Sequence, residues 1–225
     1  KNSKLSTRIG YKKTNVSQGL PGAVIFYNQT QDERLATNND LIFGDIVHIR
    51  PKFKLRGYAN ASQSLINYFD PTYFNAAGKI DVDYKNRNIS GGISMNKVLI
   101  STLELFGGIE AAVSDLKTND STFALPVRFH NYGLLGTRLK LNKIRFEVSA
   151  SSQFVHEKNN NGIRAKDRSR LNPFVSITGN PMNNKLIYEI WYRNSFRMPT
   201  FNELYYNNIG NNLLEPEDAH QLNAG

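Results

Sequence analysis

Polar and apolar residues alternate along most of this chain. In 144–154, Phe146 and Val148 alternate with Arg145 and Glu147. A period of two places the two sets on opposite faces of an extended strand. The pattern therefore predicts a β-strand with one apolar and one polar face.

The same alternation recurs in several other segments, and a helical period of 3.6 residues is scarce. The best helical candidate, 109–117, fits a strand nearly as well, and we predict a strand there. The register in 86–102 is ambiguous and leaves room for a hairpin. The remaining alternating segments are 4–11, 47–50, 52–56, 80–85, 103–114, 134–141 and 185–193.

Short turns alternate with long polar loops from residue 103 onward. Asn142 and Lys143 form a tight two-residue turn between clear strands, and 179–184 forms a slightly longer one. Long loops are expected at 14–40, 59–72, 116–130, 157–169 and 198–216.

Two-faced strands with this loop pattern suit either a transmembrane β-barrel or a soluble antiparallel sandwich. Strands of about 9–11 residues, the length that crosses a membrane, favour the barrel. So do full charges on the polar faces and aromatic residues near strand ends. We predict an all-β, antiparallel transmembrane β-barrel. The aromatic residues are Tyr11, Tyr58, Tyr73, Tyr84, Phe129, Tyr132, Phe154, Tyr192 and Phe196.

Composition removes several classes of protein. The 225 residues include 28 Lys+Arg, 19 Asp+Glu and no Cys, with a net charge of +9. The absence of Cys excludes disulfides, thiolate zinc sites and Cys nucleophiles. Basic residues are spread singly rather than in blocks, so we expect no nucleic-acid partner. No stretch approaches the ~18 apolar residues of a spanning helix.

Catalytic and cofactor motifs are missing as well. The four His residues lie far apart without metal-ligand spacing, and no Gly-rich phosphate loop joins a strand to a helix. We therefore expect no enzyme, no cofactor and no metal site. The four residues are His48, His130, His156 and His220.

The segment 193–217 is built to form a loop between two strands. Pro199 ends strand pairing, the Asn run allows tight turns, and Pro216 fixes the backbone before the next strand. Together these residues resemble the barrel signature of TonB-dependent outer-membrane receptors. The matching residues are Phe196, Arg197, Pro199, Thr200, Phe201, Glu203, Leu204, Tyr205, Gly210, Asn211, Leu214, Pro216 and Glu217.

Two shorter matches lie in 19–35 and 123–129. They look like the subgroup of these receptors that is grouped with the vitamin B12 receptor. At Glu215 a basic residue is more usual in the family.

The resemblance implies a barrel of about 22 strands, closed by an N-terminal plug that contacts periplasmic TonB. A chain of 225 residues supplies about nine or ten of those strands. We therefore expect 1–225 to be part of the receptor's β-barrel domain, with the plug absent from this chain.

The resemblance also implies a function: energy-coupled uptake of a metal chelate (siderophore, haem or cobalamin) across the bacterial outer membrane, with outer-membrane lipid as the surroundings. Aromatic rings and Arg suit planar anionic ligands. The candidate ligand contacts are Phe26, Tyr27 and Arg34 in one loop, with Arg197, Tyr205 and Tyr206 in another.

Other interpretations remain open. The motif residues are also explained if they only shape a loop. Charged residues such as Arg145, Glu147, Glu189 and Arg193 are expected to line the lumen and hold the plug. The alternatives are a soluble adhesin or glycan-binding β-sandwich and a passive porin. A plug encoded upstream of Lys1 would favour the receptor.

Overall fold

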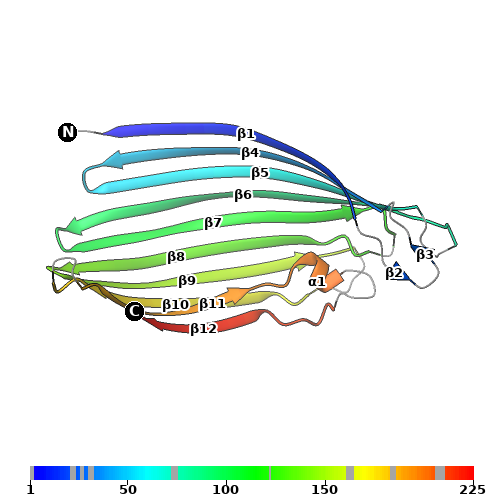
Figure 1. The fold of residues 1–225 in the computed structure, drawn as a ribbon. Coiled ribbons are helices and arrows are strands. Elements are labelled where there is room, and N and C mark those ends of the chain that lie inside the picture. Colours follow the sequence, from blue (N-terminus) through cyan, green and yellow to red (C-terminus); the bar gives the residue numbers. More distant parts are fainter. Residues whose placement is uncertain are drawn as a thin grey trace.

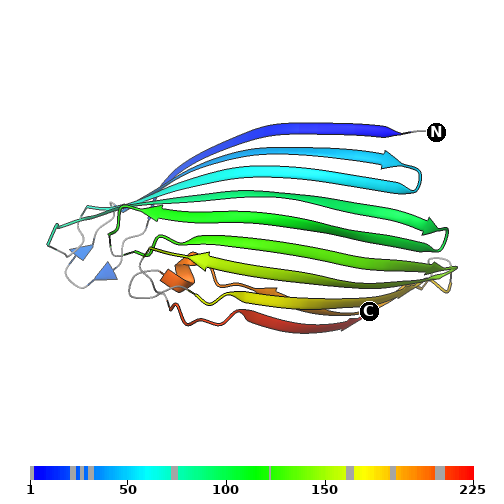
Figure 2. The same ribbon diagram turned by 180° about the vertical axis from the view of Figure 1, so that it is seen from behind.

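The computed structural model is a ten-stranded antiparallel sheet that curls into part of a barrel wall (Figures 1 and 2). The strand order is β1-β4-β5-β6-β7-β8-β9-β10-β11-β12, so neighbours in the sheet follow one another along the chain. A separate two-stranded pair, β2 with β3, lies between β1 and β4 in sequence. The structure describes residues 3–20, 24–25, 28–29, 33–71, 76–121, 123–160, 165–182, 186–205 and 211–225.

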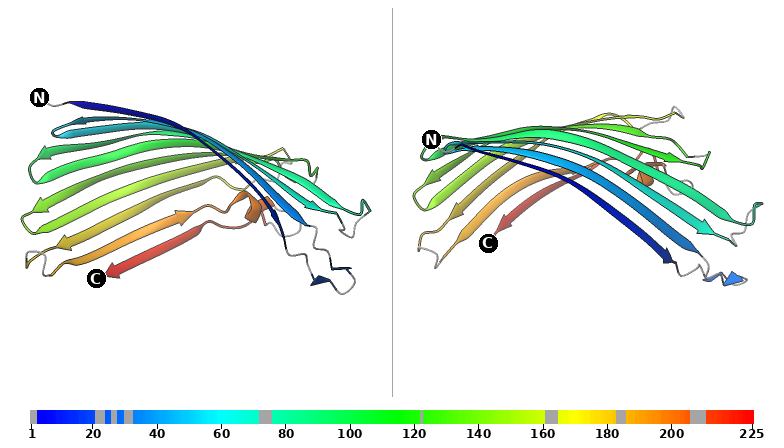
Figure 3. Two further views of the ribbon diagram at one scale, coloured as in Figure 1. Left: turned by 45° about the horizontal axis from the view of Figure 1, so that its top comes forward. Right: turned by 90° about the horizontal axis from the view of Figure 1, so that it is seen from above.

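The strands are long, and one short helix follows β11. The elements are β1 (Lys4–Gly19), β2 (Val24–Ile25), β3 (Asn28–Gln29), β4 (Arg34–Arg50), β5 (Phe53–Asp70), β6 (Ile80–Ile100), β7 (Leu103–Thr118), β8 (Val127–Leu141), β9 (Ile144–Lys158), β10 (Arg168–Gly179), β11 (Tyr188–Arg197), α1 (Phe201–Tyr205) and β12 (Glu217–Ala224). Short turns meet at one end of the sheet and longer connections at the other, which also carries α1 (Figures 1 and 3).

Several predicted boundaries are wrong. The predicted loop 59–72 lies largely within β5, and the predicted loop 14–40 shrinks because β1 continues to Gly19 and β4 begins at Arg34. These segments are rich in Asn, Ser and Gln, whose polarity suggested loops. Their backbone groups are nevertheless paired in the sheet, since polar side chains are compatible with a strand that extends beyond the hydrocarbon.

Other local predictions are confirmed or resolved. The segment 109–117 is strand, inside β7, and Asn142 and Lys143 form the predicted tight turn, with Asn142 at φ 49°. The ambiguous stretch 86–102 contains no hairpin. Strand β6 runs through it to Ile100, with one irregularity in register near its end.

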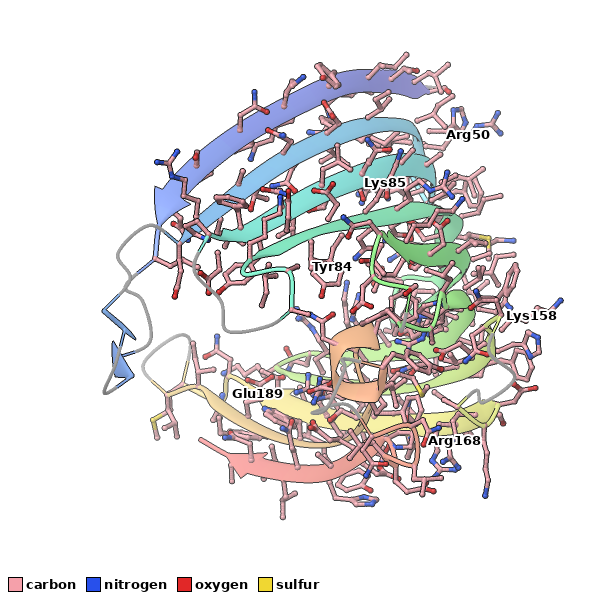
Figure 4. The ribbon with its side chains drawn as sticks, turned by 90° about the vertical axis from the view of Figure 1, so that its right-hand side faces the viewer. Arg50, Tyr84, Lys85, Lys158, Arg168 and Glu189 are labelled. Carbon is pink, nitrogen blue, oxygen red and sulfur yellow. The ribbon has the colours of Figure 1, made fainter. Side chains whose placement is uncertain are left out.

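The register separates the sheet into two faces. We call the convex face the outer face and the concave face the inner face. Tyr84 and Glu189 point into the arc of strands in Figure 4, whereas Lys85 and Lys158 point away from it. Residues paired across two strands share a face. The cross-strand pairs therefore assign every residue of the ten strands to the outer or the inner face.

The outer face is apolar through its middle and uncovered. Ile9 is 80 % exposed, Ile109 is 69 % exposed and Leu171 is 68 % exposed. Among the described residues, the buried apolar side chains are few: Leu116, Phe123, Val155, Ala165 and Leu204. The β-sandwich alternative is therefore wrong, because the apolar faces of the strands do not pack into a closed core.

An apolar face this large is far beyond what a soluble monomer exposes to water. Lipid hydrocarbon is the environment that suits it, and the strands satisfy their backbone groups within the sheet. The chain is thus part of an outer-membrane β-barrel wall, as predicted. In the described part of the chain, no helix has the length and hydrophobicity to span a membrane.

Candidate functional site

The clearest candidate site lies at the loop end of β11, where α1 folds into the mouth of the curved sheet. Thr200 and Glu203 cap this helix reciprocally. The Thr200 N–H donates to the Glu203 carboxylate at 2.6 Å, and the Glu203 N–H donates to the Thr200 hydroxyl at 3.3 Å. This is a capping box, which satisfies two N–H groups at the start of a helix.

Arg197 joins the two ends of the same loop. Its Nη2 atom lies 3.2 Å from Glu203 and 2.5 Å from Glu217, and its Nε atom donates to Glu217 at 2.9 Å. Glu217 opens β12, so one guanidinium connects β11, α1 and β12. The Thr200 N–H and the Arg197 guanidinium lower the pKa of Glu203 to about 2, which keeps this carboxylate ionised.

The inward side of α1 is held by a second, buried cluster. Leu204 is buried, and the Tyr205 hydroxyl donates to the carboxylate of Glu157, which is only 1 % exposed. Arg128 Nε donates to the same carboxylate at 2.7 Å, and its guanidinium carbon lies 4.6 Å from the centroid of the Phe201 ring. Strands β8 and β9 thereby hold the helix.

Burial and the Glu157 carboxylate raise the pKa of Tyr205 to about 12, so the phenol keeps its proton and can donate it in a hydrogen bond. The hydroxyl also accepts the Ala165 N–H at 3.2 Å. With one hydrogen bond donated to Glu157 and one accepted from Ala165, the Tyr205 hydroxyl is fully engaged within the chain. We call the set Arg128, Glu157, Phe201, Leu204 and Tyr205 the mouth cluster.

The predicted site residues do not all come together. Arg197 precedes α1 and Tyr205 is its last residue, and both are engaged within the chain, Arg197 by Glu203 and Glu217 and Tyr205 by Glu157. Arg34 begins β4 and is exposed, with a register that places it on the outer face. Three other predicted contacts, Phe26, Tyr27 and Tyr206, and the motif residue Gly210 lie outside the described residues. The ligand contacts remain predictions.

The remaining motif residues have structural positions that explain them. Phe196 is the penultimate residue of β11, and the Arg170 guanidinium carbon lies 5.9 Å from its ring centroid. Pro199 and Pro216 flank the segment outside both strands. Asn211 donates its N–H to the Glu203 carbonyl at 2.9 Å. Sequence reasoning missed Glu157, which reads only as one more polar position at a strand end.

The inner face also carries a repeated glycine–aromatic–arginine unit. Phe43 pairs across strands with Gly10, and the Arg8 guanidinium carbon lies 5.6 Å from the Phe43 ring centroid. A Cβ on the glycine would collide with the ring. The unit recurs as Gly92–Tyr58–Arg56 and as Gly136–Phe106–Arg138.

Ion pairs extend from the Arg138 unit along the inner face. Arg138 contacts Glu104 at 3.3 Å and Glu147 at 2.8 Å, and Lys140 contacts Glu104 at 3.3 Å. The predicted lumen residues Arg145, Glu147, Glu189 and Arg193 all fall on this face by register. The described residues contain no group of three or more His, Cys, Asp or Glu able to hold a metal ion.

Comparison with known proteins supports the fold. No family model and no curated protein matches the chain. Among solved structures, the copper transporter OprC superposes with a TM-score of 0.68 at 10 % identity, over 97 % of this chain and 42 % of that one. The chain therefore spans less than half the length of OprC.

Two further structures overlap more weakly. The FrpB iron transporter from Neisseria meningitidis has a TM-score of 0.45 at 9 % identity, over 87 % of this chain and 43 % of that one. The beta domain of the Bordetella autotransporter BrkA has a TM-score of 0.38 at 6 % identity, over 98 % and 90 % of the two chains. Overlaps this weak support no structural inference, whereas the OprC superposition confirms the predicted antiparallel β-barrel fold.

Proposed function

We propose that this chain is part of the β-barrel domain of a TonB-dependent outer-membrane receptor that takes up a metal chelate with energy supplied through TonB. The family motif in 193–217 is the main support from the sequence. The fold of a barrel wall and the similarity to a protein described as a copper transporter agree with metal transport.

The mouth cluster is the observation that carries the proposal. A passive pore needs no helix bound at its mouth, whereas a receptor needs loops held in a fixed arrangement to recognise one ligand. Here the matched residues Phe201, Leu204 and Tyr205 bind α1 to β8 and β9, and Arg197 fixes both loop ends.

The inner face supplies a surface for the proposed plug. Within the described residues Arg145, Glu189 and Arg193 form no ion pair, whereas Arg138 is paired with Glu104 and Glu147. A hydrated, charged inner face suits contact with a polar plug domain that is bound and then displaced during uptake.

The class of cargo is a planar or anionic metal chelate, with siderophore, haem and cobalamin as the members that the motif implies. The grouping with vitamin B12 receptors rests on the short matches in 19–35 and 123–129. We therefore propose the class of cargo, and the uptake experiment below distinguishes siderophore, haem and cobalamin.

Uptake in the native bacterium tests this function. We expect deletion of the gene to abolish saturable uptake of one labelled metal chelate, and removal of the energy-coupling protein to have the same effect. Uptake that rises linearly with concentration and ignores the coupling protein would identify a porin. Unchanged uptake of ferric siderophores, haem and cobalamin alike would reject metal-chelate transport.

A loop variant sharpens the experiment. Tyr205→Phe removes the hydroxyl that binds Glu157, and we expect weaker chelate binding with the barrel intact, because the mouth helix is no longer fixed. Tyr192→Phe is a matched control, since Tyr192 bonds His220 at an exposed site on β11 and β12. Equal loss of binding in both variants would argue against a recognition role for the loop.

A further inference from the structure

Two lysines face each other on the outer face, close to the loop end of the sheet. Lys85 of β6 is the direct cross-strand partner of Lys117 of β7. Figure 4 shows Lys85 pointing away from the arc of strands, opposite to its neighbour Tyr84. Like charges directly opposite one another destabilise a sheet, so this placement needs a compensating group.

No carboxylate in the described part of the chain forms an ion pair with either ammonium. The adjacent pair on the same face shows the contrast. Arg87 lies opposite Asp115, and its Nε donates to that carboxylate at 2.9 Å. Unlike Arg87, neither lysine has a carboxylate bonded directly to it.

The lysines line a hollow of about 360 Å³ together with polar side chains. Asn67 Nδ2 donates to the Asp83 carboxylate at 2.9 Å, and the Asp83 N–H donates to Asn119 Oδ1 at 3.0 Å. The hollow thus combines two unpaired cations with a fixed set of amide and carboxylate groups. Cations suit phosphate, and the amide and carboxylate groups suit the hydroxyls of a sugar.

The apolar part of the outer face begins beyond the Arg87–Asp115 pair, toward the short-turn end. Ile89 and Val113 are themselves a cross-strand pair, and each lies four residues from the lysine on its own strand, which is about 13 Å. Their side chains are 64 % and 40 % exposed. One amphiphile can therefore place its head on the lysines and its chains on the isoleucine and valine.

We propose that Lys85 and Lys117 bind the phosphorylated sugar headgroup of an outer-leaflet lipid, whose acyl chains lie on Ile89 and Val113. The phosphate supplies the negative charge that the lysine pair lacks. The bound lipid joins β6 to β7 from outside the barrel. This site is separate from the mouth cluster and does not depend on which ligand crosses the lumen.

Binding to the whole protein in nonionic detergent tests the site, with diphosphorylated lipid A as the probe. We expect native mass spectrometry to show lipid A bound, and lipid A to raise the midpoint of thermal unfolding. For Lys85→Ala/Lys117→Ala we expect affinity to fall at least about tenfold, since each lysine near an anionic lipid surface contributes on the order of 1 kcal/mol.

A control variant removes the same charge elsewhere. Lys52 and Lys97 are exposed at the short-turn end, and Lys97 also lies on the outer face of β6. Lys52→Ala/Lys97→Ala is expected to keep the wild-type affinity. An equal loss in this variant would mean that net charge alone attracts the lipid, which would overturn the proposal.

Two further arms complete the test. Without lipid, the Lys85/Lys117 variant is expected to unfold at or above the wild-type temperature because the repulsion is relieved, so folding failure would contradict the argument. Dephosphorylated lipid A and inorganic phosphate are each expected to give no protection. Protection by phosphate alone would identify a free-anion site and reject the lipid.

Discussion

The two faces of the sheet follow opposite rules. On the outer face, aliphatic side chains such as Ile9 and Ile109 are mostly exposed and touch little protein. On the inner face, several charged side chains are paired, as in the contacts of Arg138 with Glu104 and Glu147. This protein is therefore held together by the hydrogen bonds between its strands and by its polar inner face, while the membrane takes the place of an apolar core.

The largest effect is expected where an inner-face charge is buried. In Glu157→Ala the Arg128 guanidinium keeps its charge at 15 % side-chain exposure without its partner, which is expected to cost about 3 kcal/mol. Urea unfolding of the whole protein in vesicles measures it. Glu217→Ala, whose carboxylate is 66 % exposed beside Arg197, is expected to cost far less because solvent screens the pair. Similar costs for both would show that burial does not distinguish the pairs.

A charge placed on each face in turn tests the comparison directly. Ile109→Arg on the outer face is expected to destabilise the folded barrel by about 2–4 kcal/mol, because it places a cation in hydrocarbon. Ala112→Arg, on the inner face of the same strand, is expected to be tolerated. The measurement is the free energy of folding into vesicles. Equal destabilisation would contradict the assignment of the faces.

The glycine–aromatic–arginine units should tolerate no added side chain. In Gly136→Ala the new Cβ would lie 2.5 Å from Ser149 Cβ and against the Phe106 ring, which is expected to cost about 1–3 kcal/mol. Gly19→Ala is the control, since the nearest atom there is 3.9 Å away. Unfolding midpoints of the two variants in detergent decide the matter, and equal midpoints would show that the inner wall has room to relax.

The smallest effect concerns pH at the mouth. Glu203 ionises with a pKa of about 2 rather than 4.5, so its contribution is complete above pH 4.5 and is lost as the pH falls toward 2. Pepsin, which works in this range, should cleave near Leu204 faster as the pH falls. Glu203→Gln is expected to be cleaved readily with little change between pH 4.5 and 2. A wild-type rate independent of pH, after correction for pepsin activity on an unfolded peptide, would contradict this.

Sequence periodicity was informative for elements and faces but poor for boundaries. Alternation such as that in 144–154 indicated strands correctly, and Arg145 and Glu147 fall on the inner face as expected. The loop expected at 59–72 failed because Asn and Ser in a strand above the membrane resemble a loop in composition. Whether such a segment is a strand or a loop depends on its pairing with a neighbouring strand. A short stretch of sequence contains no information on that pairing.

The candidate site shows the same division. Thr200 and Glu203 are three residues apart, which is the spacing of a capping box, yet only a loop was predicted there and the helix was missed. The bond between Tyr205 and Glu157 joins residues 48 positions apart and depends on how far the sheet curls. No spacing rule connects them.

By itself, the sequence determined that the chain forms two-faced strands, because side-chain alternation is a property of an extended backbone. Only the tertiary structure decided which face is convex, how Lys85 comes to oppose Lys117, and what covers Glu157. These depend on register and curvature, which arise from all ten strands together.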